Sequence, residues 1–371
     1  MGQMNAPLFD LDKPSVQAEV NSYKPGLGLA WATLFPLKYT AKFDIKTIEG
    51  NDGLPISADR VAFNTRAPKK TRKKVGSFNL QLGKISVSRD KDELEINEYN
   101  DLKVIAASNT EDKAAAQELV NIVYDDIKFV NSAMDARAEI EALTIGSLGK
   151  RVFSTKLDGD MAESEEINFN IPADNFMGAT TKWDNVTTAD GIADIIKGVK
   201  KIQKLGLPKP RYAIMEQKAF DMLCSQEKVI KKVASALVKA AGLDASGDIT
   251  LDTVNAYMRA HNLPIILVID SNVIVEGKDG SQEYIKAWNE NSVVLSVEPR
   301  LGYTYWKPVP MVQNTDAMQV YGSYYKTTIY SDVNPSVETT MAEAYIQPGL
   351  TNRKSMVYIN AMNTSWNDGE E

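Results

Sequence analysis

One uninterrupted helical segment constrains this chain more than any other feature. From Glu111 to Ile145 there is neither glycine nor proline, and apolar residues recur every three or four positions. These positions are Ala115, Leu119, Ile122, Val123, Ile127, Val130 and Met134. Asn109 and Thr110 offer an N-cap, and Gly146 predicts the helix end. The pattern predicts a single amphipathic helix.

The predicted length of this helix indicates an extended subunit. At about 1.5 Å per residue, the segment spans on the order of 50 Å. A compact globule of 371 residues has a radius of gyration of roughly 21 Å, so the helix would cross the whole molecule. A coiled-coil helix is the alternative, but no second segment of similar length could pair with it. We interpret the helix as the spine of a flattened subunit.

The residues before the helix predict an extended β-hairpin loop from about Asp52 to Glu98. Apolar residues alternate with polar ones in two runs, which are Val61, Phe63 and Thr65, and then Phe78, Leu80 and Leu82. The alternation shifts phase at Gly83, after which Ile85 and Val87 continue it, and this shift predicts a β-bulge.

Charge is unevenly distributed along this loop. Its tip carries six cations and no acid, which are Arg66, Lys69, Lys70, Arg72, Lys73 and Lys74. Its return toward the helix is mainly acidic, with Asp90, Asp92, Glu93, Glu95 and Glu98. Three interpretations remain open for the tip: a solvated loop, a nucleic-acid patch, or a contact with the acidic surface of a neighbouring copy.

Overall charge and composition narrow the function classes. The formal net charge is −7, and no aromatic residue lies within the basic run, so a tightly held nucleic acid is disfavoured. Cys224 is the only cysteine, which excludes an intramolecular disulfide and favours a buried structural thiol. The uncharged run from Gly26 to Leu37 is too short to span a bilayer. These features predict a soluble protein from a reducing compartment, with no membrane partner.

The rest of the chain predicts an irregular N-terminal arm, a mixed α/β lobe and a β-rich tail. Four prolines punctuate the arm as far as Leu37. From Asp190 onward, helices are expected at 192–205, 216–241 and 251–261, and strands at 212–215, 264–269 and 293–297. A hairpin is expected from 273 to 288, and the tail predicts strands at 317–330, 337–346 and 356–359.

Catalytic and metal-binding motifs are missing from this sequence. His261 is the only histidine, and the sequence has no nucleophile-elbow motif that would go with a catalytic triad. With one histidine and one cysteine, the chain also lacks the usual ligands of a structural zinc site. The stretch Gly146 to Lys150 lacks the spacing of a phosphate-binding loop. The acidic loop from Asp158 to Glu166 lacks the spacing of an EF-hand. We therefore predict no active site, no metal and no cofactor.

The order of these parts resembles the major capsid proteins of tailed bacteriophages, the Hong Kong ninety-seven fold, and especially the branch of the lambda major head protein. The resemblance covers nearly the whole chain. A hairpin and following strand like those of that branch are carried by Ile269, Asn272, Gly277, Tyr284, Trp288, Val293 and Gly302. The resemblance implies an α+β fold with an N-terminal arm (1–51), an extended loop (52–98), a peripheral domain holding the spine helix at about 111–146 (99–189), an axial domain (190–298) and a return to the peripheral domain with the C-terminal strands (299–371).

The resemblance also implies a function and partners. The protein would be a non-enzymatic subunit of an icosahedral virion shell, assembled in the host cytoplasm as hexamers and pentamers around packaged viral DNA. Each extended loop would overlie an adjacent subunit, and axial domains would meet at capsomer centres. A separate scaffolding protein, a portal, possible decoration proteins and weak non-specific contact with DNA are the implied partners. No residue identifies an interchain covalent crosslink.

Two other function classes stay open from sequence. An encapsulin-like cellular compartment has the same fold and would need a cargo-binding inner surface. A cytosolic enzyme built on the α/β lobe would need a pocket of convergent polar groups.

Overall fold

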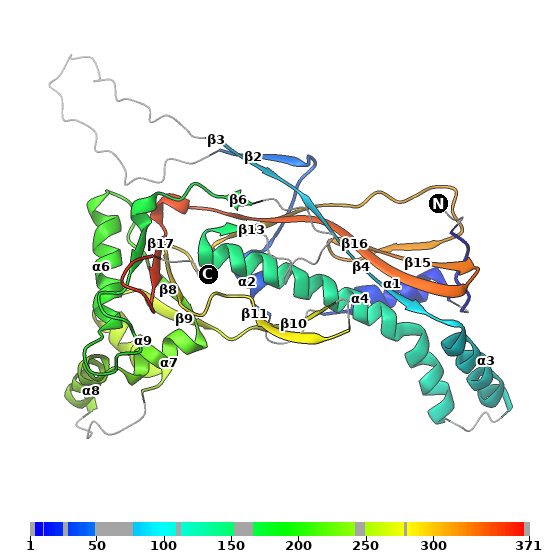
Figure 1. Ribbon diagram of the computed structural model, residues 1–371, viewed down its shortest axis with the longest axis horizontal. Helices are drawn as coiled ribbons and strands as arrows, with labels where there is room; N and C mark the ends of the chain where they lie inside the picture. The colour runs from blue at the N-terminus through cyan, green and yellow to red at the C-terminus, as the bar shows by residue number, and fades with distance from the viewer. Residues whose placement is uncertain are drawn as a thin grey trace, which may run out of the picture.

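The computed structural model describes residues 4–9, 11–24, 29–48, 77–108, 113–151, 166–241, 249–277 and 280–366. The molecule is elongated and of the α+β class. A long helix, α4 (Lys113–Leu148), runs through its middle, and a group of shorter helices lies at one end (Figure 1). The N-terminal segment and the long strands of the main sheet occupy the other end.

Helix α4 confirms the predicted spine, but its end differs from the prediction. Gly146 lies inside the helix, which continues to Leu148 and stops at Gly149, where φ is +70°. The amide of Gly149 donates to the carbonyl of Ile145 at 2.9 Å, as a left-handed C-terminal cap requires. Gly146 serves close packing instead, because a Cβ there would lie 3.1–3.3 Å from Leu301, Trp288 and Phe35. The predicted N-cap residues 109 and 110 lie outside the described residues.

Burial changes along α4. Near Asp125 the helix has one exposed face, whereas from Ala138 to Ser147 nearly every residue is buried. The last ten or so residues of α4 are therefore enclosed by the rest of the subunit, with Glu139 and Glu141 among the buried side chains.

The main sheet covers α4 and is organised around one long strand, β16 (Ser336–Leu350). Its strand order is β1 (Leu37–Tyr39), β13 (Gly302–Lys307), β16, β15 (Tyr325–Val333) and β14 (Met318–Tyr321). β4 (Gly83–Lys91) also pairs with β16, antiparallel, over Glu338 to Ile346. The strand predicted at 317–330 is divided into β14 and β15 by a turn in which Gly322 N donates to Tyr325 O.

A second sheet separates the two hydrophobic cores. Its order is β7 (Phe176–Gly178), β17 (Val357–Asn360), β12 (Ser292–Ser296), β8 (Tyr212–Glu216) and β9 (Ile265–Ile269). Because side chains alternate along a strand, Val294 faces the core around α4, whereas Val293 and Leu295 face the core of the helical lobe. The lobe's helices are α6 (Gly191–Lys204), α7 (Gln217–Ser225), α8 (Glu227–Ala241) and α9 (Leu251–Ala260).

The single helix predicted from 216 to 241 was wrong, because α7 and α8 are separate. Gln226, which lies between them, is fully buried. Its side chain accepts from Gly191 N at 2.7 Å and donates to Trp183 O at 3.2 Å. These tertiary bonds stabilise an extended backbone at a residue whose helix propensity is good.

The N-terminal arm is more ordered than predicted. It contains α1 (Lys13–Ser22), capped by Asp12, and α2 (Trp31–Leu34), and β1 then joins the main sheet beside β13. Val16, Trp31 and Phe35 are buried in the core around α4. An arm that is irregular in sequence pattern thus packs against its own chain.

The described part of the extended loop also differs from prediction. β3 (Ser77–Gln81) pairs with β2 (Asp44–Ile48), so one strand of this ribbon comes from the predicted N-terminal arm. No bulge occurs at Gly83. The phase shift instead marks the point where the chain leaves the β2–β3 ribbon and continues as β4 in the main sheet. The alternation predicted at residues 61–65 lies outside the described residues.

Three smaller features connect the larger elements. The predicted hairpin is present as β10 (Asn272–Glu276) and β11 (Gln282–Lys286). β5 (Lys150–Arg151) pairs with β6 (Ile167–Asn168). Short 3₁₀ turns at Ala173–Asn175 and Arg353–Ser355 precede β7 and β17.

Candidate assembly surfaces

The return strand of the extended loop is joined to α4 by a buried ion pair. Lys91 Nζ lies 2.6 Å from Asp126 Oδ2, and both side chains are almost wholly buried. Arg89 Nε adds a longer contact of 3.4 Å to the same carboxylate, and its guanidinium lies over the ring of Phe129. Since β4 is also paired with β16, the base of the loop is fixed by backbone and side-chain contacts together.

The five acidic residues predicted at this base lie along the end of β4 and the start of a helix, α3 (Glu93–Ser108). Asp90 accepts from Thr339 Oγ1 at 2.7 Å, so it contributes to the main sheet. Asp92 accepts from the amides of Leu94 and Glu95, and Glu95 accepts from Asp92 N. Glu93 and Glu98 are exposed. In the described part of the chain, none of the five forms an ion pair.

Sequence reasoning missed α3, because it treated these acids as part of a strand. A signal was present: Asp92 followed three residues later by Glu95 is the spacing of a capping box, and the structure shows the reciprocal bonds of that motif.

The six basic residues predicted at the loop tip cannot be placed. Arg66, Lys69, Lys70, Arg72, Lys73 and Lys74 lie outside the described residues, so their contact with a neighbouring acidic surface stays a prediction. The described β2–β3 ribbon lies along one long edge of the molecule (Figure 1).

Large apolar side chains are exposed on two separate elements. On α3, Leu94 is 77% exposed and Val104 is 68% exposed. On the hairpin, Ile274 and Tyr284 pair directly across the strands and are 57% and 66% exposed. Ile274 and Tyr284 lie side by side, and adjoining exposed apolar side chains are typical of protein-binding surfaces.

Two buried carboxylates hold the N-terminal arm in place, and sequence reasoning did not find them. Glu139 on α4 accepts from Ala30 N at 2.9 Å and from Trp31 N at 2.7 Å. Glu338 on β16 accepts from Leu8 N at 2.7 Å and from Phe9 N at 3.1 Å. Desolvation by burial raises the pKa of both carboxyls, although the amide donors oppose that rise.

The described residues show no catalytic or metal-binding constellation. Cys224 is half-buried, less than predicted, and burial raises the pKa of its thiol to about 11, which disfavours the reactive thiolate. His261 forms the C-cap of α9 and packs against the ring of Tyr257. Among the residues that the structure describes, no group of three potential metal ligands occurs, and no helix is long and apolar enough to cross a membrane.

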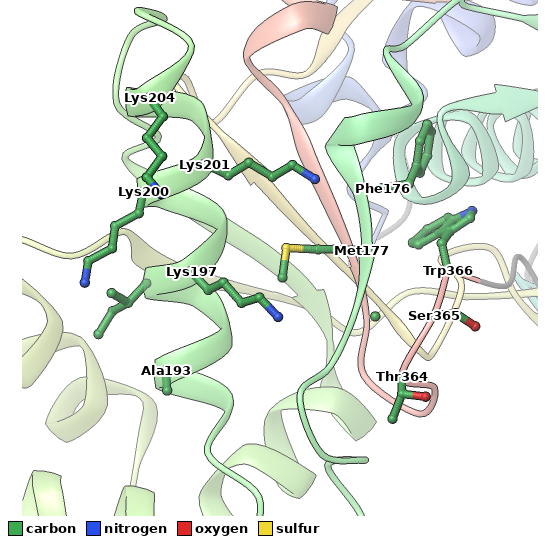
Figure 2. A pocket seen from close by; sticks show the side chains of 12 residues that line it. Phe176, Met177, Ala193, Lys197, Lys200, Lys201, Lys204, Thr364, Ser365 and Trp366 are labelled. Atoms are coloured by element: carbon green, nitrogen blue, oxygen red, sulfur yellow. The ribbon is translucent and has the colours of Figure 1, made fainter.

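An open groove of about 910 Å³ lies between α6 and β7, beside the last described residues of the chain. Four lysines of α6 line one side, which are Lys197, Lys200, Lys201 and Lys204. Phe176, Met177 and Trp366 line the other side (Figure 2). Its described lining residues include no carboxylate, histidine or cysteine that could serve as a general acid, a general base or a thiol nucleophile.

Comparison with known proteins gives a family match and two useful structural likenesses. A family model described as phage major capsid protein E matches residues 19–359. A phage-related protein from Bordetella bronchiseptica RB50 has 16% sequence identity and a TM-score of 0.54, over 98% of this chain and 99% of that one. The putative capsid protein of a prophage from E. coli CFT073 has 16% identity and a TM-score of 0.55, over 94% and 99%.

Other comparisons are weaker. An encapsulin from Synechococcus elongatus PCC 7942 matches at 9% identity and a TM-score of 0.38, over 98% of this chain and 100% of that one, which is too distant to argue from. No curated protein sequence matches the chain at a significant level.

Proposed function

The chain belongs to the phage major capsid protein E family, and from this premise we propose that its copies assemble as hexamers and pentamers of an icosahedral head that encloses packaged viral DNA. Family membership makes it a shell-forming structural subunit of the virion rather than an enzyme, and it confirms the expected tailed-phage capsid fold. Self-assembly into a shell follows from the family, and the arrangement of subunits within that shell is what we propose.

The observation that carries the proposed geometry is the separation of exposed surfaces along an elongated subunit. α3 and the hairpin β10–β11 both expose large apolar side chains, while the helical lobe occupies one end of the molecule (Figure 1). A monomer gains nothing from such exposure. Neighbouring copies that cover these side chains would gain about 25 cal/mol for each Å² of apolar surface removed from water.

We assign parts of the subunit to roles in the shell. Residues 1–51 form the N-terminal arm, 52–98 the extended loop, 99–189 the peripheral domain with the spine helix, 190–298 the axial domain, and 299–371 the return. The separate hydrophobic core of the helical lobe supports an axial unit. The packing of α1 and α2 against α4 supports an arm that is partly a component of the peripheral core.

The loop's charges suggest how neighbours recognise one another. Glu93 and Glu98 are exposed and have no cationic partner in the described chain, so they are available to another subunit. The basic tip of a neighbouring loop, Arg66 to Lys74, supplies the opposite charge. This head-to-tail contact repeats around a ring, as a closed capsomer requires.

We propose further partners for the assembled shell. A separate scaffolding protein, a portal, possible decoration proteins and weak, non-specific contact with DNA complete the proposal. The negative net charge of the chain agrees with weak contact, because strong non-specific binding needs extensive phosphate neutralisation.

Electron microscopy of the purified protein tests the assembly directly. We expect closed shells or capsomer rings, with DNA inside particles taken from infected cells. Discrete monomers under all assembly conditions would overturn the proposal. Particles that enclose protein cargo instead of DNA would favour an encapsulin-like compartment.

A further inference from the structure

The lysine-lined groove in the helical lobe is not used by the proposed assembly contacts. Lys197 and Lys201 are one helical turn apart on α6, and Figure 2 shows both extending toward Met177 and the C-terminal residues 364–366. Lys200 and Lys204 form a second row on the same helix. Among the described residues, no acidic side chain lines the groove.

In the part of the chain that the structure describes, these four lysines have no carboxylate partner, unlike Lys218 and Lys232 of the same lobe. Lys218 lies 2.6 Å from Glu290, and Lys232 lies 2.5 Å from Asp190. Within the described ranges, Lys197, Lys200, Lys201 and Lys204 form no ion pair. Like charges three and four residues apart on a helix repel, so the row favours an anionic occupant.

The chain itself supplies anions beside this groove. Trp366 is half-buried and packs against Phe176 and Tyr358, at ring-centroid distances of 4.9 Å and 5.9 Å. This packing fixes the point at which the sequence continues. The next residues, which lie outside the described ones, read Asn-Asp-Gly-Glu-Glu and carry three side-chain carboxylates.

The tether is long enough for these carboxylates to reach the lysines. Trp366 lines the same groove as Lys197 and Lys201, and the five residues that follow it span up to about 17 Å when extended. A tethered group acts at an effective concentration of the order of millimolar. A free acidic segment or a neighbour's tail has no such advantage.

We propose that the α6 groove is the docking site of the chain's own acidic segment, with the carboxylates of Asp368, Glu370 and Glu371 against Lys197 and Lys201. This inference is independent of the proposed shell geometry. It assigns to the lysine-lined groove an occupant within the same subunit.

Zero-length carbodiimide crosslinking followed by mass spectrometry tests this contact. The probe joins a carboxylate to an amine only when the two touch. We expect crosslinks from the segment 368–371 to Lys197 or Lys201, at least fivefold above those to the exposed Lys231 of α8. Mixing ¹⁴N- and ¹⁵N-labelled copies should give crosslinked peptides of a single label. Mixed-label peptides would identify a neighbour's tail and overturn the proposal, as would the absence of crosslinks to the groove.

Retention on a heparin column gives a second, independent readout. Neutralising the segment with Asp368→Asn, Glu370→Gln and Glu371→Gln should expose the lysine row and increase retention. In a Lys197→Gln/Lys201→Gln background the same three changes should increase retention by less than half as much. Equal increases in both backgrounds would reflect net charge alone and would overturn the proposal. Lys228→Gln/Lys231→Gln on α8 removes the same number of charges and is the matched control background, in which the full increase should persist. Both tests work on dispersed subunits, so failure to form shells would not affect them.

Discussion

At the scale of single residues, buried carboxylates hold segments that lack their own secondary-structure partners. Glu139 satisfies two amides at the start of α2, where the first N–H groups of any helix have no internal acceptor. Glu338 accepts hydrogen bonds from the backbone amides of Leu8 and Phe9 in the same way, at the beginning of the arm. Each carboxylate comes from an element fixed by the central core, so the arm is attached to the most stable part of the subunit.

Replacing Glu139 with alanine should destabilise the attachment of the arm. Two backbone donors would lose their acceptor, at a cost of about 1–3 kcal/mol for each buried group. Glu139→Gln keeps one acceptor oxygen and should cost less. Hydrogen exchange at Ala30 and Trp31, with the unfolding free energy, measures the effect, and the exposed Glu93→Gln is the control. Unchanged exchange in the alanine variant would contradict the role.

The raised pKa values of buried carboxyls predict whether the stability of the subunit rises or falls with pH. Desolvation raises the pKa of Asp135, Glu139 and Glu338 in the folded state, so the native protein binds these protons more tightly than the unfolded chain. Their contribution to stability is full below the ordinary carboxyl pKa and is lost as pH rises through the raised values.

Unfolding free energies measured across this pH interval test the sign. The wild-type curve should fall more steeply with increasing pH than that of Glu139→Gln or Glu338→Gln, because the amide does not titrate. Parallel curves would show that these carboxyls do not titrate in the folded state above their ordinary range.

At the scale of elements, local pattern predicted α4, α6, α9 and most strands of the lobe, because their periodicity and their packing agree. Predictions from local pattern were wrong where long-range hydrogen bonds determine where an element begins or ends. Gln226 separates α7 from α8 through contacts with Gly191 and Trp183, which are distant in sequence. The phase shift at Gly83 was visible in the sequence, but its cause, an exchange of strand partners, depends on residues 44–48 and 338–346.

The candidate surfaces divide in the same way. The acidic base of the loop could be predicted from the sequence, because a run of charged residues is visible without knowing the fold. The roles of Glu139 and Glu338 could not be predicted from the sequence. In the sequence each looks like an ordinary polar residue of an amphipathic segment, and only the folded arm brings backbone amides to its carboxylate. The exposed pair of Ile274 and Tyr284 required the register of β10 and β11.

The ion pair between Lys91 and Asp126 links β4 to α4. We expect the effects of substitutions at these two residues on the unfolding free energy to be strongly coupled. Lys91→Met should destabilise the subunit by about 3–5 kcal/mol, because Asp126 would remain buried with only the longer contact to Arg89. Lys91→Met with Asp126→Leu should recover most of that loss. Chemical denaturation of the two single variants and the double variant measures the coupling. A double variant no more stable than Lys91→Met would argue against it.

At the scale of the whole molecule, the elongated shape separates the surfaces that neighbours must share. α4 gives the subunit a stiff axis of about 54 Å at 1.5 Å per residue. The ion pair at Lys91 and the pairing of β4 with β16 connect the loop to that axis. Contacts made by the loop are therefore connected directly to the core around α4.

Reversal of charge at the loop tip tests whether the loop binds a neighbour. Lys69, Lys70, Arg72 and Lys73 changed together to glutamate should abolish or strongly slow shell assembly, because they would then face the acidic surface around Glu93 and Glu98. The isolated subunit should keep its unfolding free energy, since the described core holds none of these residues. Light scattering and electron microscopy measure assembly, and circular dichroism checks the fold.

A compensating variant makes this test specific to the proposed contact. Glu93→Lys with Glu98→Lys should weaken assembly alone and should restore it, at least in part, when combined with the reversed tip. Glutamate at Lys197, Lys200, Lys201 and Lys204 carries the same charge change at a surface that the proposed contact does not use, and it should leave assembly unchanged. Normal shells from the reversed tip would show that the basic run is only a solvated loop.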